Sequence, residues 1–399
     1  MRIAHFSDLH YAANTLTEVD RCFGFAVDRA IEANVDVAVI SGDSTDHQLD
    51  LHIRAVSALA SQVRRLADHC PVLMLQGTFS HEPPGTLDVF RLLGGRFPVY
   101  VADRIGQVAL AGRQWVASAD WCFETFPEGT QLVMSCLPTV NKAVLAGLAG
   151  VADAAQAMGS AISAVLAGWG IVNDKARASG IVTAGTGHGT ISGCVTEHGV
   201  PMAGLDHEFT LGALFSAHAS AFMVGHIHKQ QTWQRDGRMI GYAGSMGRLH
   251  YGEVDPKGFL LWDIDVNGAT AKFIETPART MVHLDFVGAP DMEAIKKAAA
   301  ATGGAFVRVR WEVPEEDRDT VDRTAIEAIL GNAAEVRLEG RILPTVRSRA
   351  DGILKARTLA EKVLKWCEVT GIRHEGLVDR LEALNLKDPE AIATEILQQ

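Results

Sequence analysis

The sequence lacks the cysteine patterns that staple small secreted domains or hold structural zinc. Its six cysteines lie singly, without any Cys-x-x-Cys pair, which argues against a disulfide framework and against a zinc ribbon. It has no internal repeat and no low-complexity linker, and a strand-like run begins at Arg2, where a secretory leader would be expected. We therefore expect a globular protein of the reducing cytoplasm, with two or three domains in its 399 residues.

The sequence also lacks an excess of positive charge. Its formal net charge is −11, which argues weakly against a large nucleic-acid footprint. Two local clusters of cations contrast with this balance. One comprises Arg337, Arg341, Arg347, Arg349, Lys355 and Arg357. The other comprises Lys229, Arg235, Arg238 and Arg248. Each cluster is either a solvated mixed surface or a rim that follows a phosphate backbone.

One apolar run, Val151–Val172, is long enough to suggest a membrane span. However, Asp153 and Gln156 interrupt it, and alanine and glycine dominate over leucine and isoleucine. The run also lies between the strand-like segments Leu132–Ser135 and Ile181–Ala184. We expect a helix that packs on the protein's own core or on a partner, and no association with a membrane.

The richest signal is a set of five short motifs, each at the end of a strand-like run. In chain order they are Asp8-Leu9-His10, Gly42-Asp43, Ser80-His81-Glu82, Gly187-His188 and Gly225-His226-Ile227-His228. Together they supply carboxylates and imidazoles, which suit a pair of divalent metals that bind phosphate oxygen and water. Buried histidines and aspartates can also be purely structural, but the ordered set favours a two-metal phosphoesterase.

The spacing of the motifs predicts that they converge in space. The runs Arg2–Ser7, Val35–Ser41 and Val72–Gln76 read as strands, and the helical patterns Thr17–Asn34 and Leu49–His69 separate them. These units have the length of βαβ units with a parallel sheet. Because parallel strands end at the same edge of a sheet, where ligand sites form, the motifs should meet there.

The sequence predicts three regions along the chain. Residues 1–278 carry every motif, and the strand-rich segment from Met239 to Glu275 suggests a second sheet packed on the first. Residues 279–345 alternate strands and helices and predict a small α+β module. Residues 346–399 predict helices at about Ile353–Thr370, Gly376–Leu384 and Pro389–Leu397, of which the last has Asp388 as N-cap.

These motifs resemble those of the calcineurin-like metallophosphoesterases, and most closely the SbcD type of bacterial nuclease subunit. The likeness includes Gly42-Asp43-x-x-Asp46, His188-Gly189-Thr190 and the segment Tyr242-Ala243-Gly244-Ser245. It implies an α/β fold, a two-sheet sandwich flanked by helices, with a small α+β module that caps DNA and a helical C-terminal tail. It further implies a metal-dependent DNA nuclease, acting as a homodimer with an SbcC-like coiled-coil ATPase in DNA end processing and repair.

Carried over to this sequence, the resemblance implies one metal held by Asp8, His10, Asp43 and His228. It implies a second metal held by Asp43, His188 and His226, with a bridging hydroxide as the nucleophile. The catalytic residue would be His81, facing the scissile phosphate. Manganese is the expected ion, because imidazole-rich sites favour it over magnesium.

The sequence departs from the family's usual Gly-Asn-His motif. Here Ser80 precedes His81 and would stand where the asparagine oxygen binds the second metal, so we expect that metal to be held weakly. Asp46 stands where archaeal and eukaryotic relatives carry a histidine, and it is a candidate ligand or partner of a ligand. Further candidates for phosphate contact are Arg248, His250, Arg347 and Arg349.

Two other functions stay open. One is a phosphodiesterase or phosphatase of the same superfamily that acts on small molecules. The other is a catalytically weak subunit that binds DNA ends or its ATPase partner, with Ser80 as a sign of decay. The basic C-terminal region favours a polymeric substrate over the first, and retention of the other ligands argues against the second.

Overall fold

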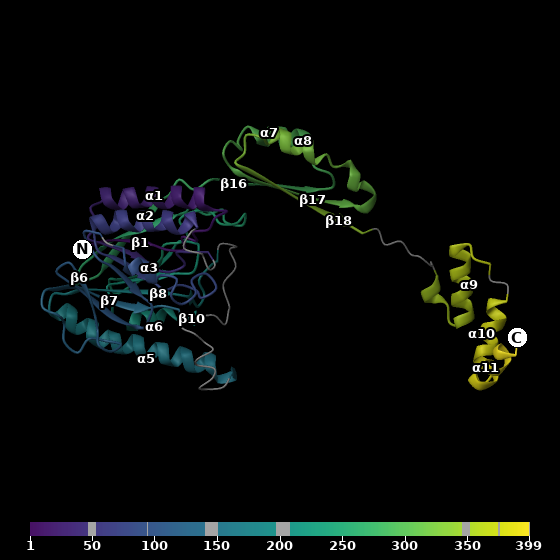
Figure 1. The fold of residues 1–399 in the computed structure, drawn as a ribbon, viewed down its shortest axis with the longest axis horizontal. Coiled ribbons are helices and arrows are strands. Elements are labelled where there is room, and N and C mark those ends of the chain that lie inside the picture. The colour runs from purple at the N-terminus through teal and green to yellow at the C-terminus, as the bar shows by residue number, and fades with distance from the viewer. Residues whose placement is uncertain are drawn as a thin grey trace. The chain divides into compact units, whose positions relative to one another are not determined.

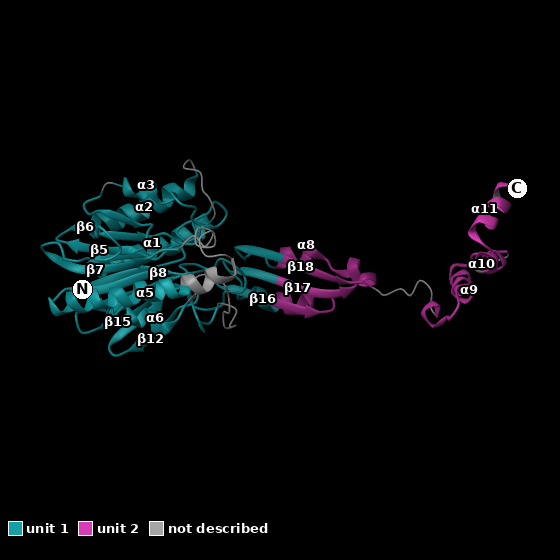
Figure 2. Ribbon diagram, turned by 90° about the horizontal axis from the view of Figure 1, so that it is seen from below, with its two compact units in different colours: residues 1–283, 297–308, 330–337 teal, residues 284–296, 309–329, 338–399 magenta. Residues whose placement is uncertain are grey.

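The computed structural model describes residues 1–46, 53–93, 95–139, 151–196, 208–344, 352–373 and 376–398. The chain forms two compact units, which Figure 2 shows in different colours. Unit 1 comprises residues 1–283, 297–308 and 330–337, and unit 2 comprises residues 284–296, 309–329 and 338–399. The domain borders expected from the sequence, after residues 278 and 345, stay predictions.

The first sheet of unit 1 has the strand order β15-β14-β1-β2-β3-β4. Its strands are β1 (Arg2–Phe6), β2 (Val37–Ile40), β3 (Val72–Leu75), β4 (Val99–Ala102), β14 (Gly258–Ile264) and β15 (Ala269–Glu275). Strands β1 to β4 are parallel, and the helices α1 (Leu16–Glu32), α2 (Arg54–His69) and α3 (Asp88–Arg91) lie between them in the chain. The predicted βαβ units are therefore confirmed.

The second sheet has the order β12-β13-β11-β8-β7-β5-β6. Its strands are β5 (Gly106–Ala111), β6 (Gln114–Ala117), β7 (Thr130–Leu137), β8 (Val182–His188), β11 (Ala221–Gly225), β12 (Gln231–Arg235) and β13 (Arg238–Tyr242). Strands β7, β8, β11 and β13 are parallel. The helices α5 (Val151–Ala178) and α6 (Leu211–Ser216) belong to this half, with the short parallel pair β9 (Thr190–Ile191) and β10 (Glu208–Phe209).

The two sheets pack face to face between helical layers, with α1 and α2 on one side and α5 and α6 on the other (Figure 1). The alternation along β2 shows how this arises. Val37 and Val39 face the other sheet, whereas Ala38 and Ile40 face α1 and α2. A strand buried on both faces reads as a continuous apolar run. The expected two-sheet sandwich flanked by helices is confirmed.

Helix α5 packs on the core through one face. Its buried residues Ile162, Leu166, Trp169 and Ala176 recur at helical spacing, whereas Ile171 on the opposite face is 63% exposed. Among the described residues, no helix is long and apolar enough to cross a membrane. The expectation of a packed helix in this apolar run is confirmed.

A third sheet and the tail follow. The sheet has the order β16-β17-β18, with β16 (Met281–Val287), β17 (Phe306–Pro314) and β18 (Glu335–Leu343). Its helices are α7 (Met292–Ala299), α8 (Arg323–Ile329) and the short 3₁₀ turn η1 (Glu315–Thr320). The tail contains η2 (Ile353–Lys355), α9 (Leu359–Thr370), α10 (Leu377–Leu386) and α11 (Pro389–Leu397).

The first tail helix begins later than expected. The Thr358 side chain accepts from the Glu361 backbone N–H, and the Glu361 carboxylate accepts from the Thr358 backbone N–H. This capping box satisfies donors that would otherwise lack partners and fixes the start of α9 at Leu359. The predicted helix Ile353–Thr370 is therefore divided into η2 and α9.

His5, on β1, is a fully buried histidine between the sheets. Its Nε2 lies 2.8 Å from the Ser41 hydroxyl, while its Nδ1 is buried without a partner. Burial lowers the pKa of His5 from 6.5 to about 3, because the charged imidazolium would lose its hydration. The ring is thus neutral in the folded protein at neutral pH.

His5 should make stability fall with acidification. Below pH 6.5 the unfolded chain gains a proton at His5 that the folded protein does not bind until about pH 3. The free energy of unfolding should therefore decrease by up to about 1.4 kcal/mol per pH unit in this window. Urea unfolding of His5→Asn at pH 7, 6 and 5 should show a shallower decrease than wild type. The control is His69→Asn, at the C-terminal end of α2, and equal slopes for His5→Asn and wild type would contradict the assignment.

Candidate metal centre

Four of the predicted metal ligands have left-handed backbone. Among the described residues, seven non-glycine residues have positive φ, and they include Asp8 (51°), His10 (49°), Asp43 (51°) and His226 (105°). Such backbone is costly for residues with a Cβ and concentrates at functional sites. Each of the four follows the C-terminal end of β1, β2 or β11, so the chain turns at the edge where the parallel strands end.

Asp8, His10 and His228 form the first group of ligands. Their ligand atoms all lie within 4.8 Å of one another. The Nε2 atoms of His10 and His228 are 3.1 Å apart. Two imidazole nitrogens that bind the same ion, each at about 2.1 Å, lie about 3 Å apart when the angle at the ion is 90°. The spacing and the donor set therefore fit a divalent cation.

Asp43, His188 and His226 form the second group. His188 Nε2 lies 3.2 Å from Asp43 Oδ2, and both side chains are almost fully buried. The Thr78 hydroxyl contacts both, since it lies 3.1 Å from His188 Nε2 and donates to Asp43 Oδ2 at 3.2 Å. The Thr78 backbone N–H donates to Asp43 Oδ1 at 2.6 Å. Asp43 thus belongs to the second group, and its bridging role stays a prediction.

His81 lies beside the first group, where its ring centroid is 4.7 Å from that of His10. Its Nδ1 is 3.0 Å from Asp46 Oδ1, so a proton on Nδ1 is donated to this carboxylate. Asp46 Oδ1 is also 3.7 Å from His10 Nδ1. The carboxylate of Asp46 therefore orients the His81 ring, which is 29% exposed at the rim of the site.

Buried partners fix the orientation of two ligand rings. His188 Nδ1 donates to the Ser41 carbonyl at 2.8 Å, and His228 Nδ1 donates to Glu253 Oε1 at 2.7 Å. Glu253 is itself held by the buried Lys257, whose Nζ lies 2.9 Å from Glu253 Oε2. Each ring therefore presents Nε2 to the site, as metal-binding histidines commonly do when a carbonyl or carboxylate accepts from the other nitrogen.

The electrostatics couple the two ligand groups. Burial opposes the charge of His188, but the neighbouring carboxylates of Asp43 and Asp8 raise its pKa to about 9. Burial would raise the pKa of Asp43, yet the His188 imidazolium holds it below the ordinary value. Burial, and then His188, lower the pKa of His226 to about 4. A cation bound by these residues would replace the proton on His188.

The structure does not place Ser80 at the second group of ligands, where the sequence predicted it. Ser80 is exposed, and the hydroxyl beside Asp43 and His188 belongs to Thr78. Gly77 could have indicated this position. Thr78 follows Gly77 directly, as the asparagine follows the glycine in the Gly-Asn-His motif of the metallophosphoesterases that the sequence resembles. Phe79 and Ser80 are then two additional residues before His81.

Sequence reasoning gave no role to Glu82. Its buried carboxylate accepts from the backbone N–H groups of Ser44 and Gly77, the second at 2.6 Å. Burial, followed by the charge of Asp43, raises the pKa of Glu82 to about 7. The side chain joins the loop after β2 to the loop after β3, and so connects Asp43 to Thr78.

The candidate phosphate contacts have other partners. All five guanidinium N–H groups of Arg248 are used on the backbone carbonyls of Glu253, Val254, Asp255, Ala278 and Arg279. Contact between Arg248 and phosphate would require these hydrogen bonds to break, and it stays a prediction. His250 Nδ1 accepts from the Gly252 backbone N–H, and its Nε2 lies 3.3 Å from Glu253 Oε1. Arg347 and Arg349 lie outside the described residues.

No protein-family model and no curated protein matches the sequence. Solved structures with a similar backbone include GAP50, the anchor in the inner membrane complex of Plasmodium, at 14% identity, over 69% of this chain and 84% of that chain, with a TM-score of 0.41. A dimetal phosphatase from Danio rerio is 10% identical, over 68% of this chain and 98% of that chain, with a TM-score of 0.38. A single mutant of Vps29 from Entamoeba histolytica is 11% identical, over 69% of this chain and 99% of that chain, with a TM-score of 0.23. Similarity this low carries no argument about function, which must come from the side chains of this chain.

Thr78→Asn should strengthen the second group of ligands. A carboxamide oxygen is a better ligand than a neutral hydroxyl and reaches further from the backbone. We expect calorimetric titration with Mn²⁺ to show roughly tenfold tighter binding at the weaker site, or about 1.4 kcal/mol. Ser80→Asn is the matched control, because Ser80 is exposed. Tighter binding in Ser80→Asn, with no change in Thr78→Asn, would reverse the assignment.

Proposed function

We propose that this chain is a two-metal phosphoesterase. The observation that carries the proposal is the pair of ligand groups, Asp8 with His10 and His228, and Asp43 with His188 and His226, at one edge of the sandwich. When bound, two divalent cations there would stabilise negative charge on phosphate oxygens and lower the pKa of a water. Manganese is the ion we propose, because four of the six ligands are imidazoles.

The proposed catalytic residue is His81. Its hydrogen bond to Asp46 orients the ring beside the first group of ligands. Burial lowers the pKa of His81, although Asp43 and Asp46 oppose this shift. In the proposed reaction His81 donates a hydrogen bond to the scissile phosphate or a proton to the leaving oxygen.

The substrate that we propose is DNA, cleaved at phosphodiester bonds with an SbcC-like coiled-coil ATPase as partner. The basic run from Arg337 to Arg357 supports this proposal, since a polymeric substrate needs contacts outside the metal centre. The tail supports a protein partner, because it carries exposed apolar side chains, with Leu354 99%, Leu359 53% and Trp366 41% exposed. Arg347 and Arg349 remain candidate phosphate contacts within this proposal.

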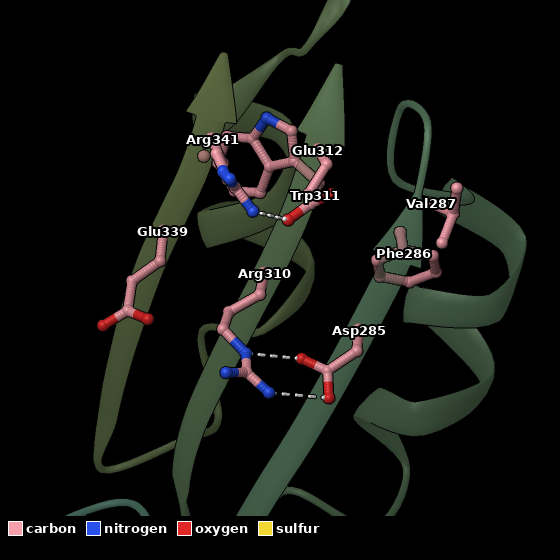
Figure 3. Close-up of a pocket in the computed structure, with 9 residues that line it drawn as sticks. Asp285, Phe286, Val287, Arg310, Trp311, Glu312, Glu339 and Arg341 are labelled. Carbon is pink, nitrogen blue, oxygen red and sulfur yellow. Dashed lines mark hydrogen bonds and ion pairs between the residues drawn. The ribbon is translucent and has the colours of Figure 1, made fainter. Parts of the chain in front are cut away.

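A phosphodiesterase or phosphatase acting on small molecules is the second candidate, and one observation favours it. Two arginines of the third sheet, one on β17 and one on β18, are paired with carboxylates (Figure 3). Arg310 donates to both oxygens of Asp285, at 2.7 and 3.1 Å, and Arg341 donates to Glu312 at 2.8 Å. Paired guanidinium groups release less free energy when they bind phosphate, because their carboxylates must first be displaced.

His81→Ala and Asp43→Ala should separate catalysis from metal binding. With a chromogenic phosphodiester, His81→Ala should lower kcat by about 10²- to 10⁴-fold while Mn²⁺ affinity, measured by calorimetry, stays close to wild type. Asp43→Ala should lose both activity and Mn²⁺ binding at the second group. The control is His69→Ala, on α2. Activity of His81→Ala near the wild-type level would remove the proposed role of His81.

The two candidate substrates predict different salt dependence. If Arg347 and Arg349 contact DNA phosphates, the double variant Arg347→Gln, Arg349→Gln should reduce the slope of log affinity for duplex DNA against log salt by roughly two. Hydrolysis of the chromogenic phosphodiester should not change. The matched control is Arg310→Gln, whose guanidinium is paired with Asp285. If DNA affinity and its slope are the same in all three proteins, the small-molecule candidate is favoured.

A further inference from the structure

A second group of charged side chains lies at the other end of the second sheet's strands from the metal centre. There, a cavity of about 260 Å³ is lined by residues that include Phe215, His218, Arg235, Asp236 and Arg238. The lining comes from the end of α6, the segment before β11 and the turn between β12 and β13. Neither the proposed function nor the metal-binding motifs use these residues.

The cavity is separate from the metal centre. In the parallel pair β11 and β13, Met239 is in register with Ala221 at the start of β11, and Arg238 comes one residue earlier. His226 follows the other end of β11. Five residues of strand at about 3.3 Å each place roughly 16 Å between the two ends. The cations Arg235 and Arg238, which flank the last metal motif in sequence, are therefore remote from it in space.

Arg238 is the unusual residue of this cavity. Its side chain is partly buried, its Nε is buried without a hydrogen-bond partner, and it forms no ion pair with a described residue. Burial, then the neighbouring Arg177, lower the pKa of Arg238 below its ordinary value. An unpaired guanidinium N–H out of contact with water is costly, so the position calls for an anion.

The carboxylates nearby do not supply that anion. Asp174 is shared, since its two oxygens accept from Arg177 and, at 2.8 Å, from His218 Nδ1. Asp236 is 79% exposed, and its only ion pair among the described residues is a long contact of 3.5 Å with Arg235. Arg177 and His218 both pair with Asp174, and Arg177 also lies in the last turn of α5, where a cation is favourable. Arg238 has no such partner among the described residues.

We propose that this cavity binds a phosphate-type oxyanion, held mainly by Arg238 and Arg235. The planar guanidinium group matches the oxygens of phosphate with two parallel hydrogen bonds. The volume is below that of sites for drug-sized ligands, which favours inorganic phosphate or the phosphate group of a small monoester. Binding would satisfy the Arg238 Nε and relieve the repulsion among the three arginines.

The experiment uses the full chain, stripped of metal with a chelator, so that the metal centre does not retain phosphate. Calorimetric titration with inorganic phosphate should give one binding event. Arg238→Met should weaken it about tenfold or more, since a charge-assisted pair is lost, and Arg238→Lys should weaken it less. The matched control is Arg64→Met, which removes an exposed arginine paired with Asp68 at 3.0 Å. His226→Ala, in the metal centre, should bind phosphate as wild type does.

The outcomes decide both the site and the ligand. No binding to the wild-type chain, or equal binding by wild type and Arg238→Met, would overturn the proposal. Loss of binding in His226→Ala would assign the phosphate to the metal centre and overturn it as well. Tighter binding of glycerol phosphate than of inorganic phosphate would identify a monoester as the ligand. If Arg238→Met is unfolded by circular dichroism, a shift of the His218 ring protons on addition of phosphate to wild type is the deciding measurement, and its absence refutes the proposal.

Discussion

The site depends on a close approach of the two sheets at the edge where their parallel strands end. A Cβ on Gly225 would lie 2.3 Å from the Ser41 carbonyl oxygen, and a Cβ on Gly42 would lie 2.3 Å from His188 Nδ1. Only glycine fits at such distances. Because the backbones meet there, the Ser41 carbonyl of the first sheet accepts from the His188 ring of the second. The aspartates of one sheet thereby reach the histidines of the other.

This approach buries charges that need partners. Glu253 and Lys257 are fully buried and pair with each other, and Glu253 also accepts from His228. A buried ion pair contributes little net stability, because desolvation offsets the attraction. Its effect here is positional, since it holds one imidazole in a single orientation. The left-handed backbone at Asp8, His10, Asp43 and His226 is a second cost accepted at this site. The chain tolerates strain and buried charge where ligands must converge.

The second sheet carries opposite chemistry at its two ends. The C-terminal ends of β8 and β11 present His188, His226 and His228, which suit cations. The N-terminal end of β13 and the turn before it present Arg238 and Arg235, which suit anions. Strand β12, which runs antiparallel to β13, produces this separation, because residues on either side of a strand in the sequence lie at its opposite ends in space.

The sequence by itself determined the βαβ units, the two-sheet sandwich and the packed helix in the apolar run, and it named the aspartates and histidines whose side chains meet in the two groups of candidate ligands. Those features depend on the local periodicity of apolar residues and on the edge of the sheet at which each parallel strand ends. Tertiary structure decided the rest. It placed Thr78, and not Ser80, beside Asp43 and His188, it used Arg248 to hold backbone carbonyls, and it moved Arg235 and Arg238 away from the metal motifs. These outcomes rest on contacts between residues far apart in the chain, whose distances no local pattern contains.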